Sequence, residues 1–493
     1  KKSGSMTRSH LRFSPDPIKS SYFIKRPEFV VCSKETYINR YDMLTNIREN
    51  GTFLYVTSKS PAELKETMPQ HMKKILYDKK IKFYTIDAYA LASKHGLQNK
   101  ISMILEACIF KISDFFDYDK VIEKVREMIV TNFTRKGEKV VNANLSSIKE
   151  VEEYLHLVEV DSSWVDEKSV SCKIAPKFDN KVFNKMIDLS ANDLKVSDFL
   201  PYKDGTYVTA TSQYEKRDIA EDVPAWISEN CIQCNQCSFV CPHAVVRPFI
   251  LSEEEYNKAP KEIQNRCVDA LGMPYKYLIN VSLQDCTGCG VCARTCPGKG
   301  GEKALKMVPV NSTCDDITEY LLENVREKSE VVKPTVKFSQ FKKPLFEYSG
   351  ACAGCGETPY LKLLSQLFGD RMVIANATGS TSIYGASTPS MPWNVAWANS
   401  LFEDNAEFGY GMLTGTNTIR NRIKNLIEEN IDKADDKTKE LLNQWLSNYD
   451  DFDITKKVYD NLDYNKVPYL KDIKEYIPSR SVWAIGGDGW AYD

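Results

Sequence analysis

The sequence contains no apolar run that reaches about 18 residues, the length that a membrane-spanning helix requires. Its formal net charge is only −2 and no basic stripe interrupts it, so nothing in the composition points to nucleic-acid binding. None of its five histidines stands beside a plausible nucleophile, which leaves no pattern typical of a hydrolytic triad. These absences argue against a membrane protein, a nucleic-acid-binding protein and a triad hydrolase.

Cysteine, by contrast, is abundant, with 15 residues in a chain of 493. Eight of the cysteines fall in two runs of one design, Cys-x2-Cys-x2-Cys-x3-Cys-Pro. The first run consists of Cys231, Cys234, Cys237 and Cys241, and the second of Cys286, Cys289, Cys292 and Cys296. The short gaps let three thiolates converge on one 4Fe-4S cubane from a tight loop, and the proline keeps the ligand loop from continuing as a helix.

In the paired form of this motif, the fourth cysteine of each run is a ligand of the other cluster. The first cluster would then be bound by Cys231, Cys234, Cys237 and Cys296, and the second by Cys286, Cys289, Cys292 and Cys241. Structural zinc is the alternative, but zinc ribbons use two separated Cys-x2-Cys pairs rather than four cysteines in 11 residues. The spacing therefore predicts two 4Fe-4S clusters and single-electron transfer in a reducing compartment.

A further pair, Cys352-Ala-Gly-Cys355, follows the two runs. The pair is compatible with a third cluster, a redox dithiol or two buried thiols, whereas Gly356 excludes a c-type haem motif. His243 either forms a hydrogen bond near a cluster or lies on the surface. The scattered cysteines are predicted to be packing residues: Cys32, Cys108, Cys172, Cys267 and Cys314.

The sequence pattern predicts an α/β multidomain protein. Alternating strand and helix patterns in residues 1–160 predict a parallel-sheet α/β domain. The expected strands are 29–32, 52–56 and 81–86, and the expected helices are 61–77, 100–115 and 118–132. Residues 161–219 have few periodic segments and predict a small connecting domain. Residues 220–344 hold both cysteine runs and predict a two-cluster, ferredoxin-like α+β domain.

Residues 345–493 begin a further α/β unit. A strand is expected at 373–376, a charged amphipathic helical region at 416–448 and a last strand at 481–485. This last strand leads into Gly487-Asp488-Gly489, where the glycines allow a close approach of a diphosphate and Asp488 offers an oxygen ligand to Mg2+. A turn with a structural aspartate is the alternative. Because the chain starts at Lys1 without a methionine and stops soon after this motif, we expect an interior fragment whose N-terminus is missing.

Several longer segments resemble pyruvate:ferredoxin (flavodoxin) oxidoreductase, nearly from end to end of the chain. The matching segments are Met6–Phe13, Tyr214–Ile219, Asn230–Cys237, Ser349–Tyr360, Asn376–Gly379, Ser400–Gly409 and Gly486–Tyr492. The resemblance implies the oxidative decarboxylation of pyruvate to acetyl-CoA and CO2, with electrons passing through 4Fe-4S clusters to ferredoxin or flavodoxin. It also implies a homodimer in the cytoplasm or in an anaerobic, hydrogenosome-like organelle.

The resemblance also implies roles for the parts of the chain. Residues 1–160 correspond to the domain associated with coenzyme A, a substrate. Residues 345–493 correspond to the truncated beginning of the domain that binds thiamine diphosphate with Mg2+ through Asp488. Cys352 and Cys355 correspond to two ligands of a third cluster, but Ser380 stands where the family has the third. A serine alkoxide is a harder and less acidic ligand than a thiolate, so we expect this cluster to assemble less well.

Two other functions are compatible with the sequence. In the first, the chain is a stand-alone electron-transfer module without substrate chemistry, because the paired cysteine runs are its only complete sites. In the second, the chain is part of a pyruvate:NADP oxidoreductase, in which a reductase domain is fused beyond the last residue. In each case we expect the fragment by itself to be unable to oxidise pyruvate.

Overall fold

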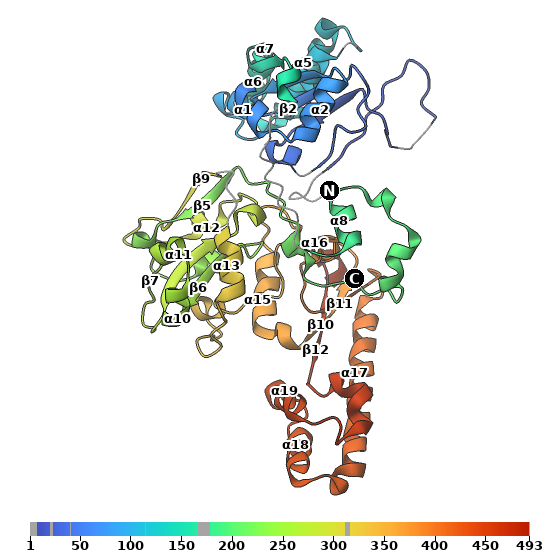
Figure 1. Ribbon diagram of the computed structural model, residues 1–493, viewed down its shortest axis with the longest axis vertical. Helices are drawn as coiled ribbons and strands as arrows, with labels where there is room; N and C mark the ends of the chain where they lie inside the picture. The colour runs from blue at the N-terminus through green and yellow to red at the C-terminus, as the bar shows by residue number, and fades with distance from the viewer. Residues whose placement is uncertain are drawn as a thin grey trace. The chain divides into compact units, whose positions relative to one another are not determined.

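The computed structural model describes residues 7–19, 23–39, 41–113, 115–165, 178–310 and 316–492 (Figure 1). Cys172 and Cys314, two of the predicted packing cysteines, lie outside the described residues. The chain divides into two compact units, one made mainly of residues 7–175 and the other mainly of residues 192–493. Each unit has its own sheets and its own hydrophobic cores, and each is described separately below.

The first unit is built on one four-stranded sheet with the strand order β1-β2-β3-β4. The strands are β1 (Phe29–Cys32), β2 (Thr52–Val56), β3 (Lys82–Ile86) and β4 (Leu155–Val158). The first three run parallel, at or within one residue of the predicted positions, and β4 pairs antiparallel with β3. The mixed α/β class with a parallel sheet is therefore confirmed, while the antiparallel edge strand was not predicted.

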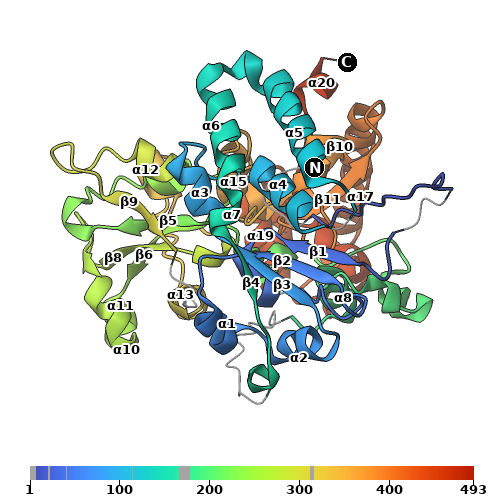
Figure 2. The ribbon, with the colours of Figure 1, turned by 90° about the horizontal axis from the view of Figure 1, so that it is seen from above.

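Helices cover both faces of this sheet (Figure 2). Phe53 and Tyr55 of β2 belong to the core that α1 and α2 cover, and Leu54 and Val56 belong to the core beneath α3 to α7. This alternation follows from the two-residue period of a strand that is buried on both faces. The helices are α1 (Pro61–Thr67), α2 (Gln70–Asp78), α3 (Ala88–Lys94), α4 (Ser102–Ile112), α5 (Tyr118–Phe133), α6 (Glu138–Lys149) and α7 (Val151–Tyr154).

The single helix predicted over residues 61–77 is wrong, because the chain forms two helices there. Met68 ends α1 in an extended conformation, with φ −69° and ψ 143°. The next residue is Pro69, whose ring disfavours a helical conformation of the residue before it. The helical spacing of apolar residues continues across the break, so a prediction based on this spacing alone gives one helix instead of two.

The second unit begins with an irregular segment, as the lack of periodicity predicted. Between residues 178 and 219 it contains α8 (Lys181–Ile187) and otherwise short 3-10 turns. The segment is anchored on the C-terminal part of the chain, since the hydroxyl of Ser212 donates a hydrogen bond to the carbonyl oxygen of Glu347 at 2.8 Å.

The part of the second unit that carries the cysteine runs is α+β, as predicted. Antiparallel β5–β9 form one sheet, and a second sheet has the order β6-β8-β7. The strands are β5 (Asp222–Trp226), β6 (Val246–Leu251), β7 (Val268–Asp269), β8 (Lys276–Val281) and β9 (Leu305–Pro309). The helices are α9 (Gln236–Phe239), α10 (Glu253–Lys258), α11 (Lys261–Arg266), α12 (Val291–Thr295), α13 (Asp316–Asn324) and α14 (Val336–Ser339). Each cysteine run contains one short helix, α9 or α12.

The C-terminal part has a three-stranded parallel sheet with the order β11-β10-β12. The strands are β10 (Met372–Ala377), β11 (Ala396–Ser400) and β12 (Ser481–Ile485). The helices are α15 (Thr358–Phe368), α16 (Ser380–Gly385), α17 (Asn405–Asn430), α18 (Asp436–Ser447), α19 (Phe452–Asn461) and α20 (Asp488–Ala491). Gly409 lets α17 lie close on the sheet, because a Cβ atom there would already be 3.3 Å from the Cβ of Ala375.

The helical region predicted over residues 416–448 is divided between α17 and α18. Asp435 accounts for the new start, since its side chain accepts a hydrogen bond from the amide of Thr438 as an N-cap. Leu442 and Trp445 of α18 then form a core with α17 and α19. Across the described ranges, no helix combines the length and the apolar character that crossing a bilayer requires.

Candidate iron–sulfur sites

The two cysteine loops fold alike. The amide of Gln233 donates to the sulfur of Cys231 at 3.4 Å, and the amide of Gly288 donates to the sulfur of Cys286 at the same distance. Gln233 and Gly288, which occupy equivalent positions, both have a left-handed backbone, with φ 55° and 67°. The amide groups of such loops turn toward sulfur, which is the arrangement that stabilises thiolates bound to iron.

Side-chain anchors hold the first loop in its left-handed conformation, which glycine adopts more easily than other residues. The side-chain nitrogen Nε2 of Gln233 donates a hydrogen bond to the carbonyl of Asp269 at 2.8 Å. The side-chain oxygen Oε1 of Gln233 accepts one from the backbone amide of Leu271. Asn235 has φ 59° and accepts a hydrogen bond from the hydroxyl of Tyr277 at 2.7 Å. The second loop has glycine at both equivalent positions and needs no such anchors.

The first cavity is bounded by thiols from both runs. Its lining includes Cys231, Cys234, Cys237 and, from the second run, Cys296. The rest of its wall is mainly apolar and aromatic and includes Trp226, Tyr277, Ile279 and Leu305.

The second cavity mirrors the first. Its lining includes Cys286, Cys289, Cys292 and, from the first run, Cys241. Its wall also includes Pro224, His243, Val245, Val246 and Thr287. The structure therefore groups the eight cysteines in the two crossed sets that the motif predicts, although the runs are far apart in sequence.

The chemistry of both cavities fits an iron–sulfur cluster. Within the described part of the chain, no three His, Cys, Asp or Glu side chains converge on a point suited to one metal ion; the thiols instead surround a volume. Each cavity wall also contains a buried donor without a partner, the indole Nε1 of Trp226 in the first and the hydroxyl of Thr287 in the second. A sulfide or thiolate sulfur would accept these hydrogen bonds.

Burial raises the pKa of three of the cavity thiols, Cys237, Cys286 and Cys292. It raises the pKa of Cys286 and of Cys292 to about 12, with a further contribution from neighbouring thiols. The pKa of Cys237 is raised for the same two reasons. Without metal these groups are neutral near pH 7, so the binding of iron must release protons from them.

The Cys352–Cys355 loop packs against the second cysteine run. A Cβ atom added to Gly354 would be 3.8 Å from the Cβ of Cys289, so the two loops pass close to each other. Both cysteines of this loop are half-buried. The loop is also tied to the first run, because the ring nitrogen Nδ1 of His243 is 3.0 Å from the carbonyl of Ser349.

His243 is buried rather than exposed, which decides between the two environments that the sequence allowed. Burial lowers the pKa of its imidazole to about 4, with a further contribution from the charge of Arg217. The neutral ring donates from Nδ1 to Ser349, and its own carbonyl accepts a hydrogen bond from the amide of Tyr348 at 2.9 Å. His243 therefore joins the second cavity to the start of the C-terminal part.

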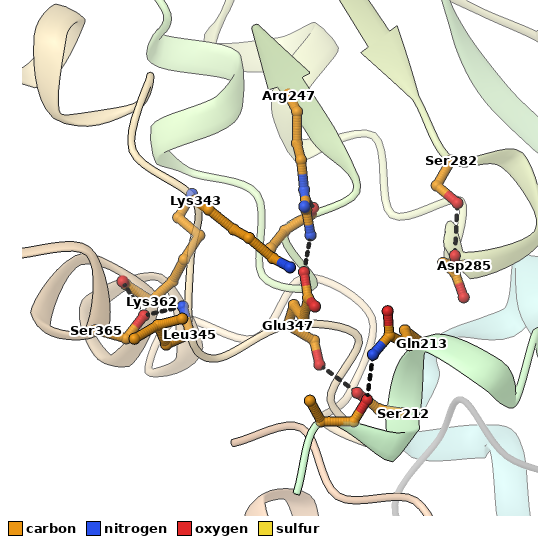
Figure 3. A network of polar contacts seen from close by, with 12 residues as sticks. Ser212, Gln213, Arg247, Ser282, Asp285, Lys343, Leu345, Glu347, Lys362 and Ser365 are labelled. Carbon is orange, nitrogen blue, oxygen red and sulfur yellow. Dashed lines mark hydrogen bonds and ion pairs between the residues drawn. The ribbon is translucent and has the colours of Figure 1, made fainter. Parts of the chain in front are cut away.

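A buried polar network surrounds this junction (Figure 3). Arg247 forms an ion pair with Glu347, and both side chains are nearly inaccessible to solvent. The Arg247 guanidinium also lies over the ring of Tyr348, 5.1 Å from its centroid. Asp285, directly before Cys286, accepts hydrogen bonds from Ser282 and Lys216. The network fixes the strands and loops that bear the cysteines.

Ser380 is exposed at the start of α16. The same helix reaches the Cys352–Cys355 loop through Tyr384, whose hydroxyl donates to the carboxylate of Glu357 at 3.0 Å. No described contact joins Ser380 itself to either cysteine. Cys267 is half-buried and forms no disulfide, and Cys32 and Cys108 are buried in the two cores of the first unit, as expected of packing residues.

The Gly487-Asp488-Gly489 motif lies at the carboxyl end of β12, where α20 begins. Parallel strands place their carboxyl ends at one edge of the sheet, and Asn376 of β10 and Asn399 of β11 meet there in a hydrogen bond of 3.0 Å. Asp488 and Gly489 are exposed. An exposed carboxylate therefore lies at this edge of the sheet.

Comparisons with known proteins agree with this arrangement. Residues 1–154 match the family described as "Pyruvate ferredoxin/flavodoxin oxidoreductase", residues 166–220 match a domain of unknown function named EKR, and residues 227–300 match a "4Fe-4S dicluster domain". The whole chain is 40% identical to the pyruvate:ferredoxin oxidoreductase of Moorella thermoacetica and 41% identical to the pyruvate-flavodoxin oxidoreductase of Enterobacter agglomerans. Along its whole length, the chain is therefore similar to a region of the pyruvate:ferredoxin and pyruvate-flavodoxin oxidoreductases. It spans 44% of the length of each of these two relatives.

An NADP-linked relative matches as well. The chain is 38% identical over its whole length to the mitochondrial pyruvate dehydrogenase [NADP(+)] of Euglena gracilis and covers 28% of that protein. Among solved structures, a pyruvate oxidoreductase subunit of Thermotoga maritima aligns with 28% of this chain and 67% of its own, at 16% identity and a TM-score of 0.22. That score is too low to support an argument about the fold.

Three buried polar residues at these sites were not predicted: Arg247, Glu347 and Lys362. Arg247 and Glu347 meet across 100 positions, and no local pattern predicts such a pair. Lys362 is almost fully buried in α15. A signal for Lys362 does exist, because it shares the helical stripe of Leu361 and Ser365, the face that should be apolar.

Proposed function

We propose that this chain is the electron-transfer portion, and part of the thiamine-diphosphate portion, of a protein that oxidatively decarboxylates pyruvate to acetyl-CoA and CO2. Ferredoxin or flavodoxin is its proposed electron acceptor. The observation that carries the proposal is the pair of cavities, each lined by three thiols of one run and one thiol of the other. The family match over the whole chain supplies the substrate class.

The proposal assigns all eight paired cysteines to 4Fe-4S clusters. Cys231, Cys234, Cys237 and Cys296 would hold the first cluster, and Cys286, Cys289, Cys292 and Cys241 the second. Bound clusters of this type exchange single electrons. The protein contributes the mainly apolar walls, the amide and side-chain donors and the positions of the thiols.

Cys352 and Cys355 are proposed as two ligands of a third site next to the second cluster. The close approach of Gly354 to Cys289 supports this position, because electron transfer requires neighbouring centres to be close. With Ser380 at a ligand position, we expect the third site to be the weakest of the three.

The C-terminal residues from 345 onward are proposed to begin the thiamine-diphosphate domain, and residues 1–160 the coenzyme A-associated domain. The intervening residues 161–219 and 220–344 would be the connecting and ferredoxin-like domains. Asp488 is the proposed Mg2+ ligand, with Gly487 and Gly489 allowing the diphosphate to approach. Thiamine diphosphate, when bound, supplies the carbanion chemistry that decarboxylation of a 2-oxoacid requires.

The cluster assignment can be tested on this chain after anaerobic reconstitution. We expect about eight iron atoms per chain from the paired cysteines, and more only if the third site assembles. We also expect a reduced-state EPR spectrum with the splitting typical of two adjacent clusters. A chain that binds about one or two zinc ions and no iron would contradict the assignment.

The catalytic part of the proposal requires the full-length protein. Supplied with pyruvate, coenzyme A, thiamine diphosphate and Mg2+, it should release CO2 and reduce ferredoxin or flavodoxin. Direct reduction of NADP would instead support the alternative that the NADP-linked relatives favour. A full-length protein that transfers electrons but leaves pyruvate unchanged would contradict the proposal and support a pure electron-transfer module.

A further inference from the structure

Lys362 is a cation in the interior of the second unit. Its relative exposure is 2%, and it lies on α15, the helix that follows the Cys352–Cys355 loop. Among the described residues, no carboxylate forms an ion pair with it; its ammonium group instead donates hydrogen bonds to the carbonyls of Ser238 and Phe239, the latter at 3.1 Å. A buried lysine without an acidic partner is unusual, because burial strongly disfavours an isolated charge.

The two carbonyls belong to helix α9, which lies along the chain between a wall residue of the first cavity and a wall residue of the second. Short helix α9 contains Cys237, a wall residue of the first cavity, and ends two residues before Cys241, a wall residue of the second. Lys362 therefore binds the backbone between one thiol of each crossed set. The carbonyl end of a helix is also its partially negative end, which favours a cation there.

The electrostatics agree with this position. Burial lowers the pKa of Lys362 to about 8, and the charge of Arg247 acts in the same direction, whereas Cys241 and Cys237 raise this pKa when they are ionised. Both cysteines are thus close enough to affect this ammonium group. A cluster with four thiolate ligands is an anion, and its reduction adds one more negative charge at a site of low polarity.

We propose that Lys362 is a tuning residue whose buried positive charge raises the reduction potentials of both 4Fe-4S clusters. This inference rests on the proposed cluster assignment. A fixed cation near both clusters stabilises each reduced form more than the oxidised form, which eases the acceptance of an electron. Lys362 lies on α15, and this helix starts directly after the Cys352–Cys355 loop, the third candidate site. The helix that places the positive charge beside α9 therefore begins at that site.

Polar neighbours keep the lysine in place. On the same face of α15, Gln366 accepts a hydrogen bond from Gln340 at 3.1 Å, and Gln340 in turn accepts one from Ser238 at 3.0 Å. Ser238 is therefore held on α15 through its side chain as well as through its carbonyl. These contacts do not need the charge of Lys362, so a neutral hydrogen-bond donor at position 362 should preserve α9.

The test is an EPR-monitored redox titration of the reconstituted chain with Lys362→Gln, Lys362→Met and Lys362→Arg. The Gln variant retains a donor without the charge, and the Arg variant retains the charge. Arg420→Gln is the matched control, since Arg420 is also buried and is also bound by carbonyls, those of Tyr449, Tyr476 and Ile477.

We expect Lys362→Gln to retain full iron content and to shift both midpoint potentials to more negative values. Lys362→Arg and Arg420→Gln should leave the potentials near those of the unmodified chain. Unchanged potentials in a fully loaded Gln variant would overturn the proposal. Loss of iron from the Gln and Met variants, with retention in the Arg variant, would assign Lys362 a structural role and overturn it as well. Failure of the unmodified chain to hold two clusters would instead refute the cluster assignment.

Discussion

The guanidinium of Arg247 and the carboxylate of Glu347 form an ion pair in which the side chains are only 11% and 4% exposed. The pair joins the strand that follows the first cysteine run to the segment that leads to Cys352. Arg247 has a further hydrogen bond to the carbonyl of Ala244 at 2.8 Å. The pair thus holds the segment that leads to Cys352 to β6, whose first residue, Val246, lines the second cavity.

We expect Glu347→Ala to destabilise the second unit by about 3–5 kcal/mol, because it leaves the Arg247 charge buried and unpaired. The double variant Arg247→Met with Glu347→Leu should recover much of that loss. Asp460→Ala is the control, since its pair with Lys456 is half-exposed and should contribute less than about 1 kcal/mol.

Hydrogen exchange provides a local measurement of this effect. The amide of Tyr348 donates to the carbonyl of His243 at 2.9 Å, so its protection reports the junction directly. Protection should fall in Glu347→Ala and return in the double variant. Equal protection in all three proteins would show that the pair does not hold the junction.

Gly288 tests the shape of the second cysteine loop. Its φ is 67°, and a Cβ atom there would stand 3.0 Å from the carbonyl oxygen of Asp222. We expect Gly288→Ala to weaken iron retention at the second cavity, because both backbone strain and a clash with main chain oppose it. The measurement is iron loss over time in the presence of a chelator.

Gly272→Ala is the matched control for this substitution. Gly272 is also left-handed, with φ 74°, but no atom stands within 4 Å of an added Cβ. The Gly272→Ala variant should lose roughly 1 kcal/mol of unfolding free energy from backbone strain alone and should retain iron normally. Equal iron loss in both variants would mean that strain, and not the contact with Asp222, limits the site.

Ser380→Cys in the full-length protein tests the third site. A thiolate binds iron more strongly than a serine alkoxide, so the substitution should raise iron content above that of the two paired clusters. Ser382→Cys, on the same helix α16, is a control for a nonspecific thiol. Iron content and reduced-state spectra that do not respond to Ser380→Cys would contradict the role given to position 380.

The sequence was most informative where spacing alone fixes the chemistry. The crossed grouping of Cys241 and Cys296 was predictable, because the motif requires two loops that exchange their last ligand. The parallel strands were predictable from continuous apolar runs. The break at Pro69 was also available in the sequence, but the helical period extends across it and a prediction from the period alone misses it.

Long-range polar contacts were not predictable. No sequence neighbour of Arg247 indicates that its partner is Glu347. No sequence neighbour of His243 indicates that its ring is buried and bonded to the distant carbonyl of Ser349. Only the tertiary structure brings such groups together. A buried ion pair also occupies positions at which apolar residues are normally expected. The edge strand β4 was missed because it is four residues long and partly exposed.

The central claim is that the two cysteine runs exchange their fourth ligands, and paired single substitutions test it most directly. Cys296→Ser should abolish the same EPR signal as Cys234→Ser, and Cys241→Ser the same signal as Cys289→Ser, each lowering iron from about eight to about four atoms per chain. Cys267→Ser, a half-buried cysteine outside both cavities, should change neither signal. A Cys296→Ser protein that instead loses the signal lost in Cys289→Ser would contradict the account.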